Sequence, residues 1–228
     1  QGTAATVLWW GYDIPISWPD DPAPDSGGLS REEMISDTVL AMNAFGAATA
    51  GKRLAAFTAT LRTAMPATAR LTLIGHSWGS MVVSQAALRM GKDEGVDYIV
   101  EIGSPGAGYQ IETARDYSAV DADHVYAVAL PKDPVPLPLA DIVADFPYPV
   151  NPLLRRRIFG VDTGPFGPDP ANEAFGARVI DVPSEHRSRL PLSIGTHALS
   201  NYLSGESLSA VAAVAAGKGS DIPLRRPK

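Results

Sequence analysis

The residues best suited to chemistry lie at positions 75–79, which read Gly-His-Ser-Trp-Gly and match the pattern Gly-x-Ser-x-Gly. An apolar run at 71–74 precedes them, and a stretch of helical character begins at 81. A strand that turns sharply into a helix, with a serine at the apex, is typical of a nucleophile elbow. Glycines on both sides of the serine are expected to leave room for a close approach of the backbone. The pattern predicts Ser77 Oγ as the nucleophile of an acyl transfer.

A second interpretation of the same residues involves no chemistry. A serine at a helix start often caps the helix, and glycines often make tight turns. A cap explains Ser77 but does not explain two glycines placed symmetrically about it, so we favour the nucleophile. The backbone N–H of Trp78 would then face the negative charge that develops on the attacked carbonyl oxygen. We expect the second donor of this oxyanion hole to be the N–H of Tyr12, in the loop after the first strand, with Gly11 giving it room.

Hydrophobic runs between turn signals predict the elements that must position Ser77. The expected strands are residues 4–10, 71–74, 98–103, 123–130 and 177–182. The expected helices are residues 31–45 and 52–65, with Gly46 and Gly51 as breaks, then the helix after the elbow and a final helix at about 206–216. Strands that alternate with helices favour an α/β fold, with a mostly parallel sheet flanked by helices. We expect one domain over residues 1–228.

Two further side chains would complete a serine triad if they reach the same edge of this sheet. Asp133 follows the strand at 123–130, in a loop stiffened by Pro131 and Pro134. His197 lies in a loop of small residues ahead of the last helix, from which a base can reach Ser77 across the strand ends. The chain order serine, aspartate, histidine is that of α/β-hydrolases, not of chymotrypsin or subtilisin. The alternative for Asp133 is an ordinary Asp-Pro turn.

Other acids and histidines compete for these two roles. The rival acids, none of which directly follows an expected strand, are Asp141, Asp145 and Asp162. The rival histidines are His76, whose side chain should point away from Ser77, His124, at the start of a strand, and His186, in a charged stretch. Asp133 and His197 are therefore the predicted acid and base.

Segments that leave the same strand ends are expected to line the substrate site. The residues predicted to line it are Gly11, His76, Ser104, Pro105 and Pro134. Ser104 is not expected to be a nucleophile, because Pro105 removes the following N–H and no helix follows directly. Residues 137–176 are rich in proline and glycine and too long for a plain connection, so we expect a lid or substrate loop.

The expected class of substrate follows from the aromatic residues near these segments. The tryptophans at positions 9, 10, 18 and 78 and the apolar patches of the long loop favour an apolar acyl or alkyl group. The alternative is that these aromatic side chains belong to the core. A small-molecule ester, or a lipid, is the expected partner.

Composition limits the other partners. The net charge of -6, with positive residues mostly scattered, argues against nucleic acid, which needs a basic face. The absence of cysteine excludes disulfides and thiolate sites. No apolar run approaches the roughly 20 residues of a membrane span. No metal-binding histidine spacing or phosphate loop is present, so no cofactor is expected. Oligomeric state and compartment stay open, with a secreted or cell-envelope location expected if a signal segment was removed.

Several short motifs carry a resemblance to a known family. They are residues 10–13 (Trp-Gly-Tyr-Asp), 75–80, 103–106 (Gly-Ser-Pro-Gly), 133–134 (Asp-Pro), 167–170 (Gly-Pro-Asp-Pro) and 175–177 (Phe-Gly-Ala). Together they resemble an actinobacterial α/β-hydrolase family long described as a domain of unknown function. The resemblance implies a three-layer α/β-hydrolase fold and a serine triad at Ser77, Asp133 and His197.

These expectations combine into one prediction of function. We expect a serine hydrolase that cleaves carboxylic esters through an acyl-enzyme on Ser77, an esterase or lipase for apolar acyl groups. An acyltransferase, or an amidase or peptidase, would use the same triad. A catalytically idle binding module would keep only the fold.

Overall fold

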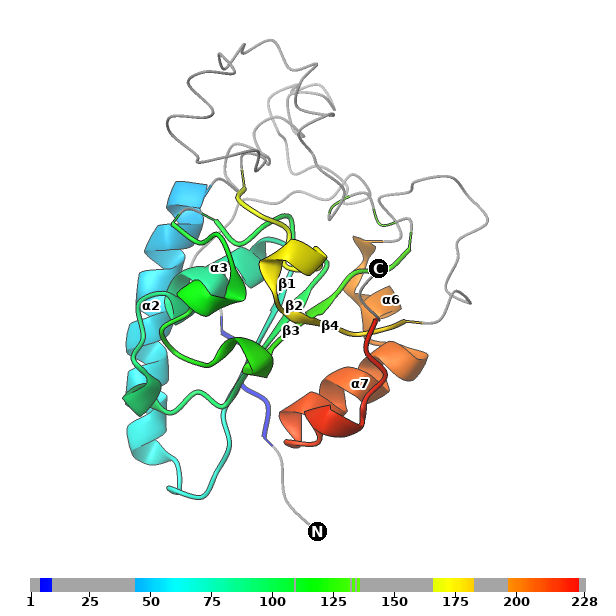
Figure 1. Cartoon of the computed structure of the whole chain (residues 1–228). Helices are drawn as coiled ribbons and strands as arrows, with labels where there is room; N and C mark the ends of the chain where they lie inside the picture. Colours follow the sequence, from blue (N-terminus) through cyan, green and yellow to red (C-terminus); the bar gives the residue numbers. More distant parts are fainter. Residues whose placement is uncertain are drawn as a thin grey trace, which may run out of the picture.

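A parallel sheet of four strands forms the centre of the protein in the computed structural model, which describes residues 5–9, 44–108, 110–131, 133, 135, 166–182 and 197–225 (Figure 1). The strands, in spatial and chain order, are β1 (Thr72–His76), β2 (Tyr98–Ile102), β3 (Val125–Val128) and β4 (Arg178–Val179). All neighbouring pairs are parallel, so the segments after β1, β2 and β3 leave from one edge. Four of the five expected strands are confirmed; β1 ends two residues later than predicted, and the other three are shorter than predicted.

Helices cover both faces of this sheet. The helices α2 (Ala44–Ala64) and α3 (Trp78–Ala87) lie on one face, and α7 (Gly205–Ala215) lies on the other (Figure 1). Along β2 the side chains alternate between the two cores: Ile99 packs with α2 and α3, whereas Val100 and Ile102 pack with α7. A parallel strand buried on both sides is expected to be almost continuously apolar, and the buried Glu101 is a polar exception in β2. The α/β fold class and the final helix are confirmed.

The helix α2 runs through both glycines that were expected to break it. Gly46 and Gly51 lie inside the single helix Ala44–Ala64, so the predicted break is wrong. A Cβ at Gly51 would lie 2.6 Å from Gln85 Cβ of α3. Gly51 therefore lets two helices approach closely, a packing role that a local propensity cannot distinguish from a helix end. Residues 31–43 of the first expected helix lie outside the described part.

The predicted first strand is wrong for its described residues, 5–9. These residues form no strand, and the side chains of Val7 and Leu8 are 55% and 77% exposed. Within the described part of the sheet β1 is consequently an edge strand, and Ile74 on it is 47% exposed. An apolar run shows that a segment can be buried. Pairing is a long-range event that the run itself does not encode.

The two glycines that flank Ser77 have very different surroundings. A Cβ at Gly75 would lie 2.5 Å from Gly79 O and from Ser80 Cα, where β1 passes the first turn of α3. A Cβ at Gly79 would meet no described atom within 4 Å. The close approach thus accounts for Gly75, and the same expectation for Gly79 finds no support among the described residues.

This contrast predicts opposite effects of the same substitution. Gly75→Ala is expected to lower the free energy of unfolding by about 2 kcal/mol or more, because the backbone of α3 would have to move. Gly79→Ala adds a helix-favouring residue in the first turn of α3 and should change it by no more than about 1 kcal/mol, in the stabilising direction. Urea denaturation of both variants measures the difference. Equal destabilisation would contradict this account of Gly75.

Candidate functional site

Ser77 occupies a strained position between β1 and α3. Its φ and ψ are 56° and -131°, one of two positive φ values among the described non-glycine residues. Such a conformation costs on the order of 1–3 kcal/mol and persists only where the surroundings impose it. Here the Ser77 N–H donates to Ile102 O (2.9 Å), and its carbonyl accepts from the Ser80 N–H (2.9 Å). The elbow is held from both the sheet and the helix.

The side chain of Ser77 does not act as a helix cap. Although Ser77 occupies the N-cap position of α3, its hydroxyl makes no capping hydrogen bond. Ser77 Oγ lies instead 2.7 Å from His197 Nε2. The cap interpretation is therefore wrong, and the strain serves to direct the hydroxyl toward an imidazole.

His197 contacts Ser77 through one ring nitrogen and Asp133 through the other. His197 Nδ1 lies 2.8 Å from Asp133 Oδ2, and Asp133 Oδ1 accepts from the Val135 N–H at 2.8 Å. Because a carboxylate only accepts, the ring proton is on Nδ1, which leaves Nε2 to accept from the Ser77 hydroxyl. The Asp133 side chain is fully buried, so the carboxylate is fixed by the protein and not by solvent. The three residues form the arrangement that nucleophilic acyl transfer requires.

His76, predicted to line the substrate site, contacts the base. Its Nε2 lies 2.9 Å from His197 O, and since a carbonyl only accepts, Nε2 carries the proton. The two imidazole rings stack, with centroids 4.8 Å apart. Burial, followed by the neighbouring His197, lowers the pKa of His76, so its neutral form is favoured. His76 thereby ties the elbow to the backbone of the base.

The other predicted site residues are placed as follows. Ser104 is buried, and its hydroxyl lies 2.7 Å from Ser80 Oγ, so the structure gives no support to a lining role. Pro105 is half-buried. His124 precedes β3 at the opposite edge, with Nδ1 2.9 Å from Asp97 O. The predicted residues outside the described part are Gly11, Tyr12, Pro134, Asp141, Asp145, Asp162 and His186.

A family model described as alpha/beta hydrolase matches residues 1–143, more than half of the chain. The chain belongs to the alpha/beta hydrolase family. The matched part contains the elbow and Asp133, while His197 lies beyond it. The family indicates that the protein is a hydrolase, and the predicted resemblance is confirmed at this level. The actinobacterial origin stays a prediction. Comparisons with curated proteins and with solved structures found no match.

The described tryptophans of the hydrolase belong to its core. The Trp78 side chain is buried with α2 and α3, and Trp9 packs partly buried against the same cluster. For these two residues the core alternative is correct, and they give no evidence for an apolar substrate. The Trp78 backbone, as the first residue of α3, stands at the positive end of the helix dipole directly after Ser77. Trp10 and Trp18 lie outside the described part.

A second polar cluster lies buried beneath the elbow helix of the hydrolase. Glu101 of β2 accepts hydrogen bonds from the Ser84 hydroxyl and from Tyr117 OH (2.8 Å). Burial raises the pKa of Glu101 to about 7. The cluster contacts none of the three residues at the strand ends, so it supports α3 against β2 and takes no direct part in the site.

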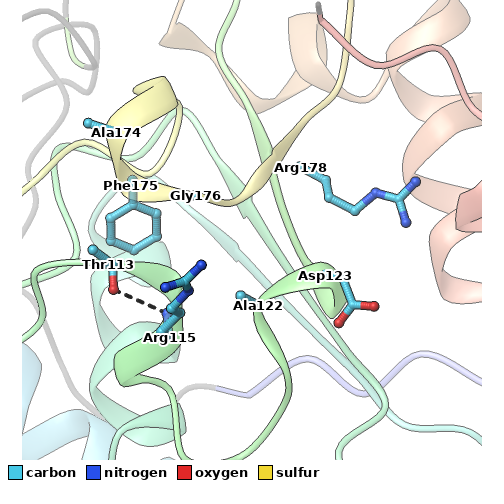
Figure 2. Close-up of a pocket in the computed structure, with 8 residues that line it drawn as sticks. All are labelled: Thr113, Arg115, Ala122, Asp123, Ala174, Phe175, Gly176 and Arg178. Atoms are coloured by element: carbon cyan, nitrogen blue, oxygen red, sulfur yellow. Dashed lines mark hydrogen bonds between the residues drawn. The ribbon is translucent and has the colours of Figure 1, made fainter. Parts of the chain in front are cut away.

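The pocket in Figure 2 lies at the opposite edge of the sheet, before β3 and β4. It has a volume of about 560 Å³ and is lined by Thr113, Arg115, Ala122, Asp123, Ala174, Phe175, Gly176 and Arg178. The Arg178 guanidinium extends over the Tyr126 ring, 5.3 Å from its centroid. In Figure 2 the Arg178 side chain points away from Arg115. The two arginines thus form no common anion site, and the pocket is remote from Ser77.

Two other kinds of feature, a metal site and a membrane-spanning helix, are absent from the described ranges. No group of three or more histidine, aspartate or glutamate side chains there could hold a metal ion. No helix among the described residues has the length and apolar character to cross a membrane.

Of the segment expected to cover the site, residues 166–176 are described. Phe166 and Phe175 from this part are buried in the core of the hydrolase.

Tyr202, a buried tyrosine whose hydroxyl donates to Asp133 Oδ2, is not among the site residues predicted from the sequence. It follows His197 by five positions, in the short helix α6 (Leu199–Tyr202). The only sequence signal was an aromatic residue close to the predicted base, which is equally typical of a core position.

Proposed function

We propose that this hydrolase is a serine esterase that cleaves carboxylic esters through an acyl-enzyme on Ser77. The observation that supports it best is the continuous line of hydrogen bonds from Ser77 Oγ through both ring nitrogens of His197 to Asp133. The strained backbone of Ser77 adds to the argument, because a serine with a purely structural role gains nothing from such strain.

The proposed reaction begins with attack of Ser77 Oγ on the ester carbonyl. His197 Nε2 takes the hydroxyl proton as the new C–O bond forms, and the buried charge of Asp133 stabilises the imidazolium. The tetrahedral intermediate collapses, and the alcohol leaves with the proton from Nε2. Water then attacks the acyl-enzyme, again losing its proton to His197, and the carboxylic acid is released while Ser77 regains its proton.

The N–H of Trp78 is proposed as one donor to the oxyanion. It directly follows the nucleophile and belongs to the first turn of a ten-residue helix, where the dipole favours negative charge. The N–H of Tyr12 remains the proposed second donor, on the argument from sequence alone. An apolar acyl group also remains a proposal from the sequence.

Hydrolysis of nitrophenyl esters over a range of acyl chain lengths tests the activity. We expect turnover with an optimum at one chain length, and a fluorophosphonate adduct in the peptide that contains Ser77. Added alcohol shows whether free acid or a new ester is formed, which separates the hydrolase from an acyltransferase, and nitroanilides test for an amidase. If the protein shows a cooperative unfolding transition but neither hydrolyses the esters nor is labelled, the function is that of a catalytically idle binding module.

A further inference from the structure

Tyr202 lies against the acid of the proposed triad. Its side chain is fully buried, and its hydroxyl donates to Asp133 Oδ2, the same oxygen that lies 2.8 Å from His197 Nδ1. The hydroxyl oxygen in turn accepts from the Leu130 N–H, at 3.3 Å. Because that lone pair is occupied by an N–H, the phenolic proton is directed at the carboxylate.

We propose that Tyr202 is a positioning residue of the active site, which orients the Asp133 carboxylate and limits the negative charge that it presents to His197. The proposal rests on the hydrolase function proposed above. It assigns Tyr202 no contact with substrate or with the reacting atoms, and its effect is exerted through Asp133.

The backbone makes room for this tyrosine. Gly103, the residue after β2, has φ 54°, and a Cβ there would lie 3.0 Å from the Tyr202 ring. Among the described residues, three donors bond to the carboxylate: His197, the Val135 N–H and Tyr202. A buried carboxylate with three donors is held in one orientation, and this fixes the tautomer and plane of the imidazole.

Tyr202 shares one carboxylate oxygen with His197. A hydrogen bond from Tyr202 draws negative charge from that oxygen, so its loss should increase the stabilisation of the imidazolium by Asp133. Burial, followed by the charge of Asp133, raises the pKa of Tyr202, so the phenol remains a donor at neutral pH. Among the described residues, the other titratable groups that act here are His76, stacked on His197, and Asp169, whose charge acts on Tyr202.

The variant Tyr202→Phe tests the proposal, because it removes the hydroxyl and keeps the ring beside Gly103. We expect kcat for a nitrophenyl ester to fall by about 10-fold to 100-fold as the acid loses its fixed orientation. KM should stay within about twofold, since substrate binding is not affected. The acidic limb of the kcat/KM profile should move to higher pH by about half a unit, because the imidazolium is better stabilised.

Tyr117→Phe is the matched control. Tyr117 is equally buried and also donates to a carboxylate, that of Glu101, but it lies outside the site. Its variant should lose stability without a change in the position of the acidic limb. A second readout needs no substrate: the proton NMR resonance of the His197 Nδ1–H should shift in Tyr202→Phe and stay in place in Tyr117→Phe.

The outcomes separate this inference from the proposed function. The inference fails if Tyr202→Phe lowers the urea midpoint and changes nothing else. In that case kcat, the pH profile and the Nδ1–H resonance match those of the parent, and Tyr202 is a core residue. If the parent hydrolyses no ester but the resonance shifts in Tyr202→Phe alone, the proposed function fails while the effect on the carboxylate stands.

Discussion

Ser77→Ala is expected to lower kcat for ester hydrolysis by about 10⁴-fold or more and to abolish fluorophosphonate labelling. The variant removes the proposed nucleophile, Ser77 Oγ, which lies 2.7 Å from His197 Nε2. It should not unfold the protein, because alanine has the same Cβ as serine at this strained φ and the hydroxyl makes no helix cap. Initial rates at saturating substrate, on protein with a parent-like urea transition, measure the loss.

Two companion variants sharpen this prediction. Ser77→Gly should be equally inactive but more stable than Ser77→Ala by about 1 kcal/mol, because glycine adopts positive φ without strain. Ser209→Ala, on the exposed side of α7, should retain parent activity. Substantial activity in Ser77→Ala would remove Ser77 from its role, and loss of labelling in Ser104→Ala would then point to Ser104.

Asp133→Asn is expected to lower kcat by roughly 10³-fold to 10⁴-fold with little change in the fold. An asparagine amide can donate to His197 Nδ1, which would place the ring proton on Nε2, where it can no longer accept from Ser77. The Val135 N–H, which bonds to Oδ1, can still bond to the amide oxygen, whereas the Tyr202 hydroxyl, which shares Oδ2 with His197, would face the amide nitrogen and would have to accept from it. Steady-state kinetics with a nitrophenyl ester give the loss in kcat.

The acids that the sequence left as rivals provide the matched controls for Asp133. They are Asp141, Asp145 and Asp162. Each one changed to asparagine should retain activity within about twofold, because Asp133 already supplies the carboxylate that lies 2.8 Å from His197 Nδ1. If one of these variants loses activity as severely as Ser77→Ala while Asp133→Asn retains it, that residue is the acid.

The elbow was predictable because its chemistry is local. A strand, a turn and a helix in direct succession are encoded by neighbouring residues, and the observed elements, β1 and α3, begin and end close to the predicted positions. The sequence indicates Asp133 because it follows a strand, and His197 because it lies in a loop of small residues ahead of the last helix, from which a base can reach across the strand ends. His197 lies 120 residues from Ser77 along the chain, and only the folded sheet brings the two side chains together.

Predictions failed where the answer depended on a distant partner. Gly51 was predicted to break a helix. The close contact that requires a glycine there is with Gln85 on another helix, and the neighbouring residues in the sequence do not reveal it. Residues 5–9 were predicted to form a strand because they are hydrophobic. Hydrophobicity indicates a tendency to be buried, but it does not show whether a neighbouring strand is free to pair with them. Trp78 borders the nucleophile in sequence, yet successive residues on a helix point in different directions, and its side chain enters the core.

The sequence by itself therefore determined the α/β class, the strand-turn-helix around Ser77 and the candidates for acid and base, because these follow from local pattern and from the order of elements. The tertiary structure alone decided which groups surround those candidates. His76 bonded to the carbonyl of His197 and Tyr202 bonded to Asp133 both result from contacts between segments far apart in the chain. The direction of a side chain toward such a partner is fixed by packing, which no local pattern contains.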